Sequence, residues 1–179
     1  DVVRELNGKM RRILPKSLFL SACIADIDLG SDSISFWNGG IPDAVIGGAQ
    51  GGIRLRLPSR QLPLGVIDLS KVDIAEVDFR RGERLLVYSD GVIETCDPAG
   101  ELFGEERLLQ AFTAADATDD WLEPILAALK SFRSSAPQSD DITLLGIGHE
   151  PALARVLAGA PRAPELQDRR ESSVAVTLD

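Results

Sequence analysis

The sequence predicts an α+β fold with antiparallel sheets. Apolar stretches with the length and alternation of strands follow one another in pairs, with short turns between them. Helical patterns do not alternate with these strands but form separate blocks, one at the start of the chain and one after its middle. The composition is that of a globular domain, because 44% of the 179 residues are hydrophobic and 26% are charged.

The first part of the chain predicts a helix followed by a pair of strands. Apolar residues recur at helical spacing from Val2 to Leu14, and Pro15 ends the helix because it cannot donate the next backbone hydrogen bond. Residues 18–27 are rich in apolar and small side chains, which indicates a strand. A turn at 28–32 leads into a second strand at 33–37, in which apolar residues alternate with serines.

The rest of the chain predicts further strands and two helices. Glycine pairs at 47–48 and 51–52 indicate a hairpin. The strands that we expect from apolar and alternating patterns cover residues 53–57, 72–79, 84–89 and 142–147. The two helices that we expect cover residues 105–112 and 121–132.

Charge and composition exclude several classes of partner. Twenty-eight acidic residues against nineteen basic ones give a formal net charge of −9, which repels a phosphate backbone, so we expect no nucleic-acid partner. No apolar stretch approaches the ~20 residues of a membrane helix and nothing resembles a signal peptide, so we expect no membrane partner and a cytoplasmic location. Cys23 and Cys96 lie too far apart for a metal motif, and we expect both thiols to be buried.

Few side chains are suited to covalent catalysis. The one histidine, His149, follows the last predicted strand, and we expect it to be a solvated surface residue. If this histidine is solvated, the sequence offers no base for an ordinary Ser-His-Asp or Cys-His site. It also lacks the glycine patterns of the common nucleotide-binding loops.

Carboxylates at the ends of predicted strands offer a different chemistry. Asp90 ends the run RLLVYS, Asp140 and Asp141 open the run ITLLGI, and Gly91 leaves room for backbone to approach. If the two strands are neighbours, these oxygens meet at one rim and suit Mg²⁺ or Mn²⁺. From the spacing alone, a pair of acidic strand ends more often reflects ordinary turn chemistry than a metal site. We expect Glu94 to be a solvated or helix-capping acid rather than a ligand.

Several motifs, taken together in order, resemble one family. The segments LLVYSDGVIET, GELFGEERLLQ and APQSDDITLLGI are similar to the metal-dependent protein phosphatases of the PPM class, which are protein phosphatase 2C-like. Within that class they resemble the bacterial SpoIIE/RsbU branch. The stretch ISFWNGGIPDAVI resembles an Asn-Ala-Gly-His-Pro-like turn of the family, with Ile41 where the family has histidine, and QLPLGV resembles its Pro-Leu-Gly element.

The resemblance implies a fold, a mechanism and a set of ligands. Such phosphatases are αββα sandwiches of two antiparallel sheets flanked by helices. They hold two Mg²⁺ or Mn²⁺ ions, whose bound water attacks a phosphoserine or phosphothreonine, so no catalytic side chain is expected. By this resemblance Asp90 and Asp140 are metal ligands, Asp141 takes the variable second position of its motif, and Gly91 is the metal-adjacent backbone.

The resemblance also sets expectations for the whole protein. It covers residues 1–149 as a phosphatase domain, whereas residues 150–179 are expected to be a linker that can lead into a following element, with 173–178 alternating like a strand. The first metal motif of the family, an Asp before a glycine-rich turn, does not occur in this chain, so we expect weak Mn²⁺ binding by these 179 residues. The expected substrate is a phosphorylated anti-sigma-factor antagonist, and the expected neighbour in the full-length protein is a receiver or sensor domain. The alternative is a degenerate phosphatase fold that binds a protein without turnover.

Overall fold

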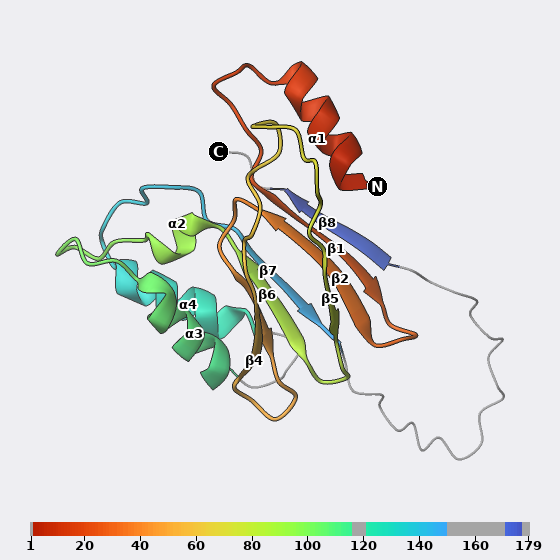
Figure 1. The fold of residues 1–179 in the computed structure, drawn as a ribbon. Coiled ribbons are helices and arrows are strands. Elements are labelled where there is room, and N and C mark those ends of the chain that lie inside the picture. The colour runs from red at the N-terminus through yellow and green to blue at the C-terminus, as the bar shows by residue number, and fades with distance from the viewer. Residues whose placement is uncertain (1, 116–120, 150–170, 177–179) are drawn as a thin grey trace, which may run out of the picture.

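Two four-stranded antiparallel sheets, stacked face to face, form the centre of the molecule (Figure 1). The computed structural model describes residues 2–115, 121–149 and 171–176. The first sheet has the strand order β5-β2-β1-β8, made of β5 (Ala75–Asp78), β2 (Ser33–Gly39), β1 (Ala22–Asp28) and β8 (Glu171–Val176). The second has the order β4-β3-β6-β7, made of β4 (Ile53–Leu57), β3 (Ala44–Gly47), β6 (Arg84–Tyr88) and β7 (Leu144–Gly148).

Helices cover the outer faces of both sheets. Helix α1 (Val2–Ile13) packs through Val3 on the outer face of the first sheet, whereas α3 (Gly104–Ala114) and α4 (Glu123–Arg133) pack on the second (Figure 1). The short helix α2 (Asp90–Ile93) follows β6. The expected αββα sandwich is therefore confirmed. No helix in the part of the chain that the structure describes is long and apolar enough to cross a membrane.

The space between the sheets is filled by side chains that alternate along the strands. On β2, Ile34 and Phe36 point inward and are almost completely buried, as the period-two pattern of the sequence requires. All five residues of β6 are buried, because the inter-sheet core lies on one face of this strand and α3 and α4 lie on the other. This strand runs through the middle of the second sheet and ends at the rim considered below.

Cys23 lies in the inter-sheet core, and its burial has a measurable consequence. Burial raises the pKa of its thiol to about 11, because the thiolate loses its hydration there. At pH 8 we expect iodoacetamide to alkylate the half-buried Cys96 and to spare Cys23 in the native protein, and to alkylate both after denaturation. Mass spectrometry counts the labels. A Cys96→Ser variant should take no label when native, and labelling of that variant would contradict the assignment.

Several strands differ from the expected boundaries, and β5 covers only Ala75–Asp78 of the expected 72–79. The strand expected at residues 18–27 begins only at Ala22, because Leu20 makes an isolated bridge to Leu64 instead of joining the ladder. The strand expected at 173–178 is β8, and it pairs antiparallel with β1 inside the first sheet. Residues 150–170 and 177–179 lie outside the described residues, so the proposed division of the chain after residue 149 stays a prediction.

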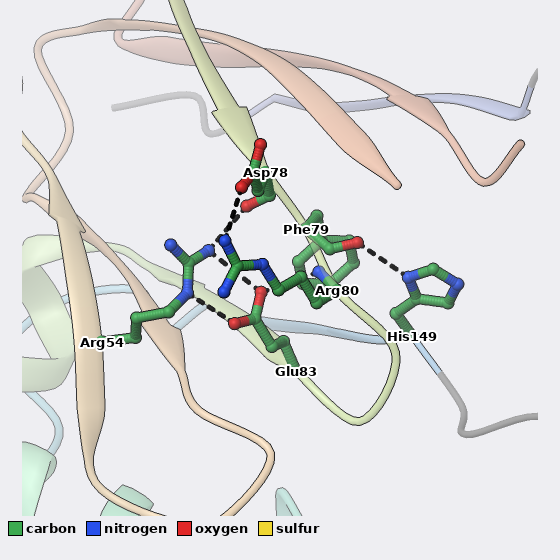
Figure 2. Close-up of polar contacts among 6 residues, drawn as sticks. All are labelled: Arg54, Asp78, Phe79, Arg80, Glu83 and His149. Carbon is green, nitrogen blue, oxygen red and sulfur yellow. Dashed lines mark hydrogen bonds and ion pairs between the residues drawn. The ribbon is translucent and has the colours of Figure 1, made fainter. Parts of the chain in front are cut away.

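The expectation that His149 is solvated is wrong. The residue is 6% exposed, and its Nδ1 lies 2.8 Å from the carbonyl oxygen of Phe79 (Figure 2). Its ring packs against the Phe79 ring with a centroid distance of 5.6 Å. Its Nε2 lies 3.6 Å from Asp32 Oδ1. The histidine is buried because β5 and β7 end beside each other, a contact between residues 70 positions apart.

A buried carboxylate organises the same end of the sandwich. Glu83 accepts two bonds from the guanidinium of Arg54, at 2.5 and 2.9 Å, and one from the backbone N–H of Arg80 at 2.8 Å (Figure 2). Such a bidentate pair fixes geometry as well as charge. Because β6 begins here and β7 ends here, this cluster and His149 lie at the opposite end of the second sheet from Asp90.

Candidate metal centre

The first candidate ligand, Asp90, lies just beyond the end of β6. The strand ends at Tyr88, and Ser89 keeps an extended backbone with φ −80° and ψ 161°. Asp90 then opens the four-residue helix α2 and is half-buried. Its Oδ1 accepts the backbone N–H of Gly91 at 2.9 Å. The carboxylate therefore belongs to a tight turn out of a buried strand, where backbone hydrogen bonds restrict its position.

The second candidate pair, Asp140 and Asp141, lies in the segment that enters β7. Both residues are exposed, and Asp140 Oδ1 accepts the backbone N–H of Asp141 at 2.7 Å. Strands β6 and β7 are antiparallel neighbours, with Tyr88 opposite Leu144. The two strands are thus adjacent, as the prediction required, and the end of β6 and the start of β7 share one rim.

Ser89 joins the two segments directly. This buried side chain donates its Oγ–H to the carbonyl oxygen of Asp141 at 3.1 Å, and the same Oγ accepts the backbone N–H of Thr143 at 3.0 Å. Its own backbone N–H donates to the carbonyl oxygen of Thr143 at 3.0 Å. Three hydrogen bonds from one residue therefore hold the segment with the second candidate pair against the turn that carries Asp90. Sequence reasoning missed this role, because a single serine gives no sign of a partner more than fifty positions away.

Gly91 permits this close approach. A Cβ atom added at this position would come closer than 3.0 Å to the carbonyl oxygen of Asp141, 3.1 Å from its carbonyl carbon and 3.4 Å from Asp140 Cβ. No side chain fits between the two segments, so backbone packs on backbone. Asp90 and Asp140 consequently lie on segments in van der Waals contact.

The carboxylate oxygens of Asp90 and Asp140 are of the chemical type that a hard divalent cation prefers. Both carboxylates use Oδ1 for a local backbone N–H, and no hydrogen bond within the described residues uses Oδ2 of either one. Mg²⁺ and Mn²⁺ favour such oxygen ligands and keep several waters when few carboxylates are present. Among the described residues, however, no group of three or more His, Cys, Asp or Glu side chains is placed to hold a metal ion. Asp90 and Asp140 therefore fit as two ligands of a cation site but do not form a complete coordination shell.

A second polar cluster adjoins the same rim. The Tyr88 hydroxyl lies 3.3 Å from Glu105 Oε1, and the same oxygen accepts Arg56 Nη1 at 2.6 Å. Burial, together with the neighbouring Glu105 carboxylate, raises the pKa of Tyr88 well above its ordinary value, so the phenol stays protonated and donates. The contacts connect β4, β6 and the start of α3. Glu94, by contrast, is exposed beyond the end of α2, in agreement with the expectation.

Comparison with known proteins identifies the family. The family model described as stage II sporulation protein E (SpoIIE) matches residues 1–150. Protein IcfG of Synechocystis sp. is 30% identical over 132 residues, which are 73% of this chain and 21% of IcfG. The chain therefore spans about a fifth of that relative.

Solved structures share the fold at lower identity. The SiaA-PP2C domain of Pseudomonas aeruginosa has a TM-score of 0.69 at 20% identity, over 79% of this chain and 57% of that one. The PP2C phosphatase domain of SpoIIE from Bacillus subtilis, with a fragment of its regulatory domain, has a TM-score of 0.67 at 17% identity, over 80% of this chain and 42% of that one. Because the family model matches residues 1–150, the chain belongs to the stage II sporulation protein E (SpoIIE) family.

Proposed function

We propose that this domain hydrolyses phosphoserine or phosphothreonine in a protein substrate, with Asp90 and Asp140 as ligands of a divalent cation. The observation that carries the proposal is the clamp at the rim: Ser89 binds the segment before β7, and Gly91 lets that segment pack on the turn. A turn that only reverses the chain does not need two carboxylates on two segments that are hydrogen-bonded to each other. Membership of the SpoIIE family supports the phosphatase class.

Each residue at the rim has a distinct part in the proposed chemistry. Asp90 and Asp140 supply negatively charged oxygens, and Asp141 is the candidate for a further, outer ligand. Ser89 and Gly91 fix the distance between the two sides. When bound, Mg²⁺ or Mn²⁺ neutralises phosphate charge and lowers the pKa of coordinated water. The related RsbX, which shares the fold with a TM-score of 0.53, was solved in complex with magnesium.

The proposed substrate is a phosphorylated anti-sigma-factor antagonist, and the proposed context is a longer bacterial regulator with a receiver or sensor domain. The match to the SpoIIE family supports the proposed substrate. The proposed longer regulator is supported because this chain covers only 21% of IcfG and 42% of the SpoIIE chain from Bacillus subtilis. We propose residues 1–149 as the phosphatase domain. The expected cytoplasmic location stays a prediction.

A non-catalytic binding module is the second candidate. The observation that favours it is that no three metal-ligating side chains converge within the described residues. Both candidates share the fold and a protein partner, so only turnover separates them. The binding module predicts complex formation with a phosphoprotein that is independent of divalent cations and leaves the phosphate in place.

The test is hydrolysis of an aryl phosphate and of a phosphoserine peptide by the full-length protein. We expect turnover in Mn²⁺ or Mg²⁺, none after EDTA, and recovery when the cation is restored, because the proposed site has no side-chain nucleophile to act alone. Calcium is a useful control, since its larger radius and flexible coordination suit the same oxygens less well for this chemistry. Absence of turnover with every cation would favour the binding module, and turnover that persists in EDTA would exclude the proposed mechanism.

A further inference from the structure

The short helix that carries Asp90 cannot hold its conformation alone. Helix α2 has four residues, and a single helical turn is unfavourable by itself because it fixes several backbone torsions for few hydrogen bonds. Ser89, at the N-cap position, gives it no side-chain hydrogen bond, because its Oγ is bonded to Asp141 and Thr143 instead. The conformation of α2 therefore depends on contacts from outside the helix.

Thr95 supplies one such contact. Its side-chain hydroxyl donates to the carbonyl oxygen of Gly91 at 2.7 Å, a typical distance for an O–H···O bond, and both residues are buried. Its own carbonyl oxygen accepts the backbone N–H of Phe103, also at 2.7 Å. Phe103 is buried in the hydrophobic cluster that α3 and α4 form with the second sheet. Thr95 thus ties α2 to the core of the domain.

Gly91 is the residue of α2 that most needs such a bond. The close approach of Asp141 excludes a Cβ atom here, so the position requires glycine, which has the greatest backbone freedom of any residue. The N–H of Gly91 donates to Asp90 Oδ1 at 2.9 Å, and its carbonyl oxygen accepts the Thr95 hydroxyl. The hydroxyl therefore restrains the same residue that restrains the Asp90 carboxylate.

We propose that Thr95 is a positioning residue of the candidate metal centre. Its hydroxyl holds the Gly91 carbonyl, and the Gly91 N–H holds Oδ1 of Asp90 in the orientation that a cation ligand needs. Loss of the hydroxyl leaves a buried carbonyl oxygen without this donor, which favours a backbone movement toward another partner. The effect on cation affinity rests on the proposed function, whereas the restraint on Gly91 does not.

The test compares two substitutions that remove the same kind of hydrogen bond at different places. Thr95→Val keeps the shape of the side chain and removes the hydroxyl. Thr113→Val is the matched control, because Thr113 Oγ1 likewise donates to the carbonyl oxygen four residues earlier, at 2.9 Å. Thr113 lies two residues before Ala115, whose carbonyl oxygen accepts Arg84 Nη1 at the start of β6. The control therefore lies at the opposite end of that strand from Asp90.

Calorimetric titration of Mn²⁺ into the full-length protein measures the effect on the site. Mutation of a residue that orients a metal ligand costs about 10- to 100-fold in metal affinity, so Thr95→Val should bind Mn²⁺ at least about tenfold more weakly than the wild type. Thr113→Val should bind Mn²⁺ as the wild type does. Thr95→Ser, which keeps the hydroxyl, should recover most of the affinity lost in Thr95→Val. Equal affinity in the wild type and Thr95→Val would overturn the proposal.

Hydrogen exchange separates this proposal from the proposed function, because it needs no cation. In EDTA, we expect the Gly91 amide proton, which is bonded to Asp90 Oδ1, to exchange at least about tenfold faster in Thr95→Val and at the wild-type rate in Thr113→Val. Mass spectrometry of peptic fragments that contain Gly91 measures the rate. If the wild type binds no Mn²⁺ but exchange follows this pattern, the proposed function fails and the restraint by Thr95 is supported.

Two further outcomes decide the proposal. Unchanged exchange at Gly91 in Thr95→Val would overturn it in either case. Should Thr95→Val fail to fold, Thr95→Ala removes the same hydroxyl with a smaller side chain and should show both effects. Wild-type Mn²⁺ affinity and wild-type exchange in Thr95→Ala would then show that the hydroxyl positions nothing.

Discussion

Replacement of Asp90 or Asp140 by asparagine should lower the metal-dependent phosphatase activity at least about 100-fold. Loss of a residue that only orients a metal ligand already costs about 10- to 100-fold in metal affinity or activity, so loss of a ligand should cost more. Asparagine keeps the size of the side chain but removes the charge that holds a hard cation. The measurement is the initial rate of phosphoserine peptide hydrolysis against Mn²⁺ concentration.

Two further variants, Asp26→Asn and Asp141→Asn, serve as the control and the comparison for this result. Asp26→Asn removes the same charge from an exposed position on β1, in the other sheet, and should leave the rate unchanged. Asp141→Asn tests the outer position, because the backbone carbonyl of this residue, which accepts the Ser89 bond, is retained. A loss smaller than that of Asp140→Asn is expected. Full activity in both Asp90→Asn and Asp140→Asn would show that the rim does not carry the chemistry.

Gly91→Ala should destabilise the domain and impair the site together. The new methyl group would lie closer than 3.0 Å to the carbonyl oxygen of Asp141, so the segment before β7 must move away. Overpacking of this kind costs about 1–3 kcal/mol, measured as the change in the free energy of unfolding in urea. The displacement also separates Asp140 from Asp90, so we expect a higher Mn²⁺ requirement for half-maximal activity.

Gly8→Ala is the matched glycine control. Gly8 lies in α1, and its added Cβ would meet only Arg12 Nη1 at 3.9 Å. Alanine there should stabilise the domain by up to about 1 kcal/mol, since it favours the helix. If Gly91→Ala were as stable as the wild type with an unchanged Mn²⁺ requirement, the close contact that we describe at the rim would not exist in solution.

The sequence was informative where structure is local and periodic. Alternation of apolar and polar residues predicts β2, and the apolar run up to Tyr88 predicts β6. The short strand β3 escaped prediction because all four of its residues are buried and glycines flank it, so no alternation marks it. Helix α2 has only four residues, too few for a period. The order of the motifs was sufficient to suggest the family.

What the sequence did not reveal depends on contacts between distant residues. His149 is buried because it meets Phe79, and nothing in its neighbours along the chain indicates this. Ser89 looked like an ordinary residue before an Asp-Gly pair, yet it bonds to Asp141 and Thr143. The buried Oδ1 of Asn38, which has no hydrogen-bond partner among the described residues, likewise follows from the placement of two sheets rather than from a motif.

The central claim is that Asp90 and Asp140 hold a divalent cation jointly. The most direct measurement is calorimetric titration of Mn²⁺ into the full-length protein and its two asparagine variants, with Asp26→Asn as the control. We predict saturable binding by the wild type and the control, and a loss of affinity of at least about tenfold in each asparagine variant. Equal Mn²⁺ affinity in the wild type, Asp90→Asn and Asp140→Asn would contradict the account.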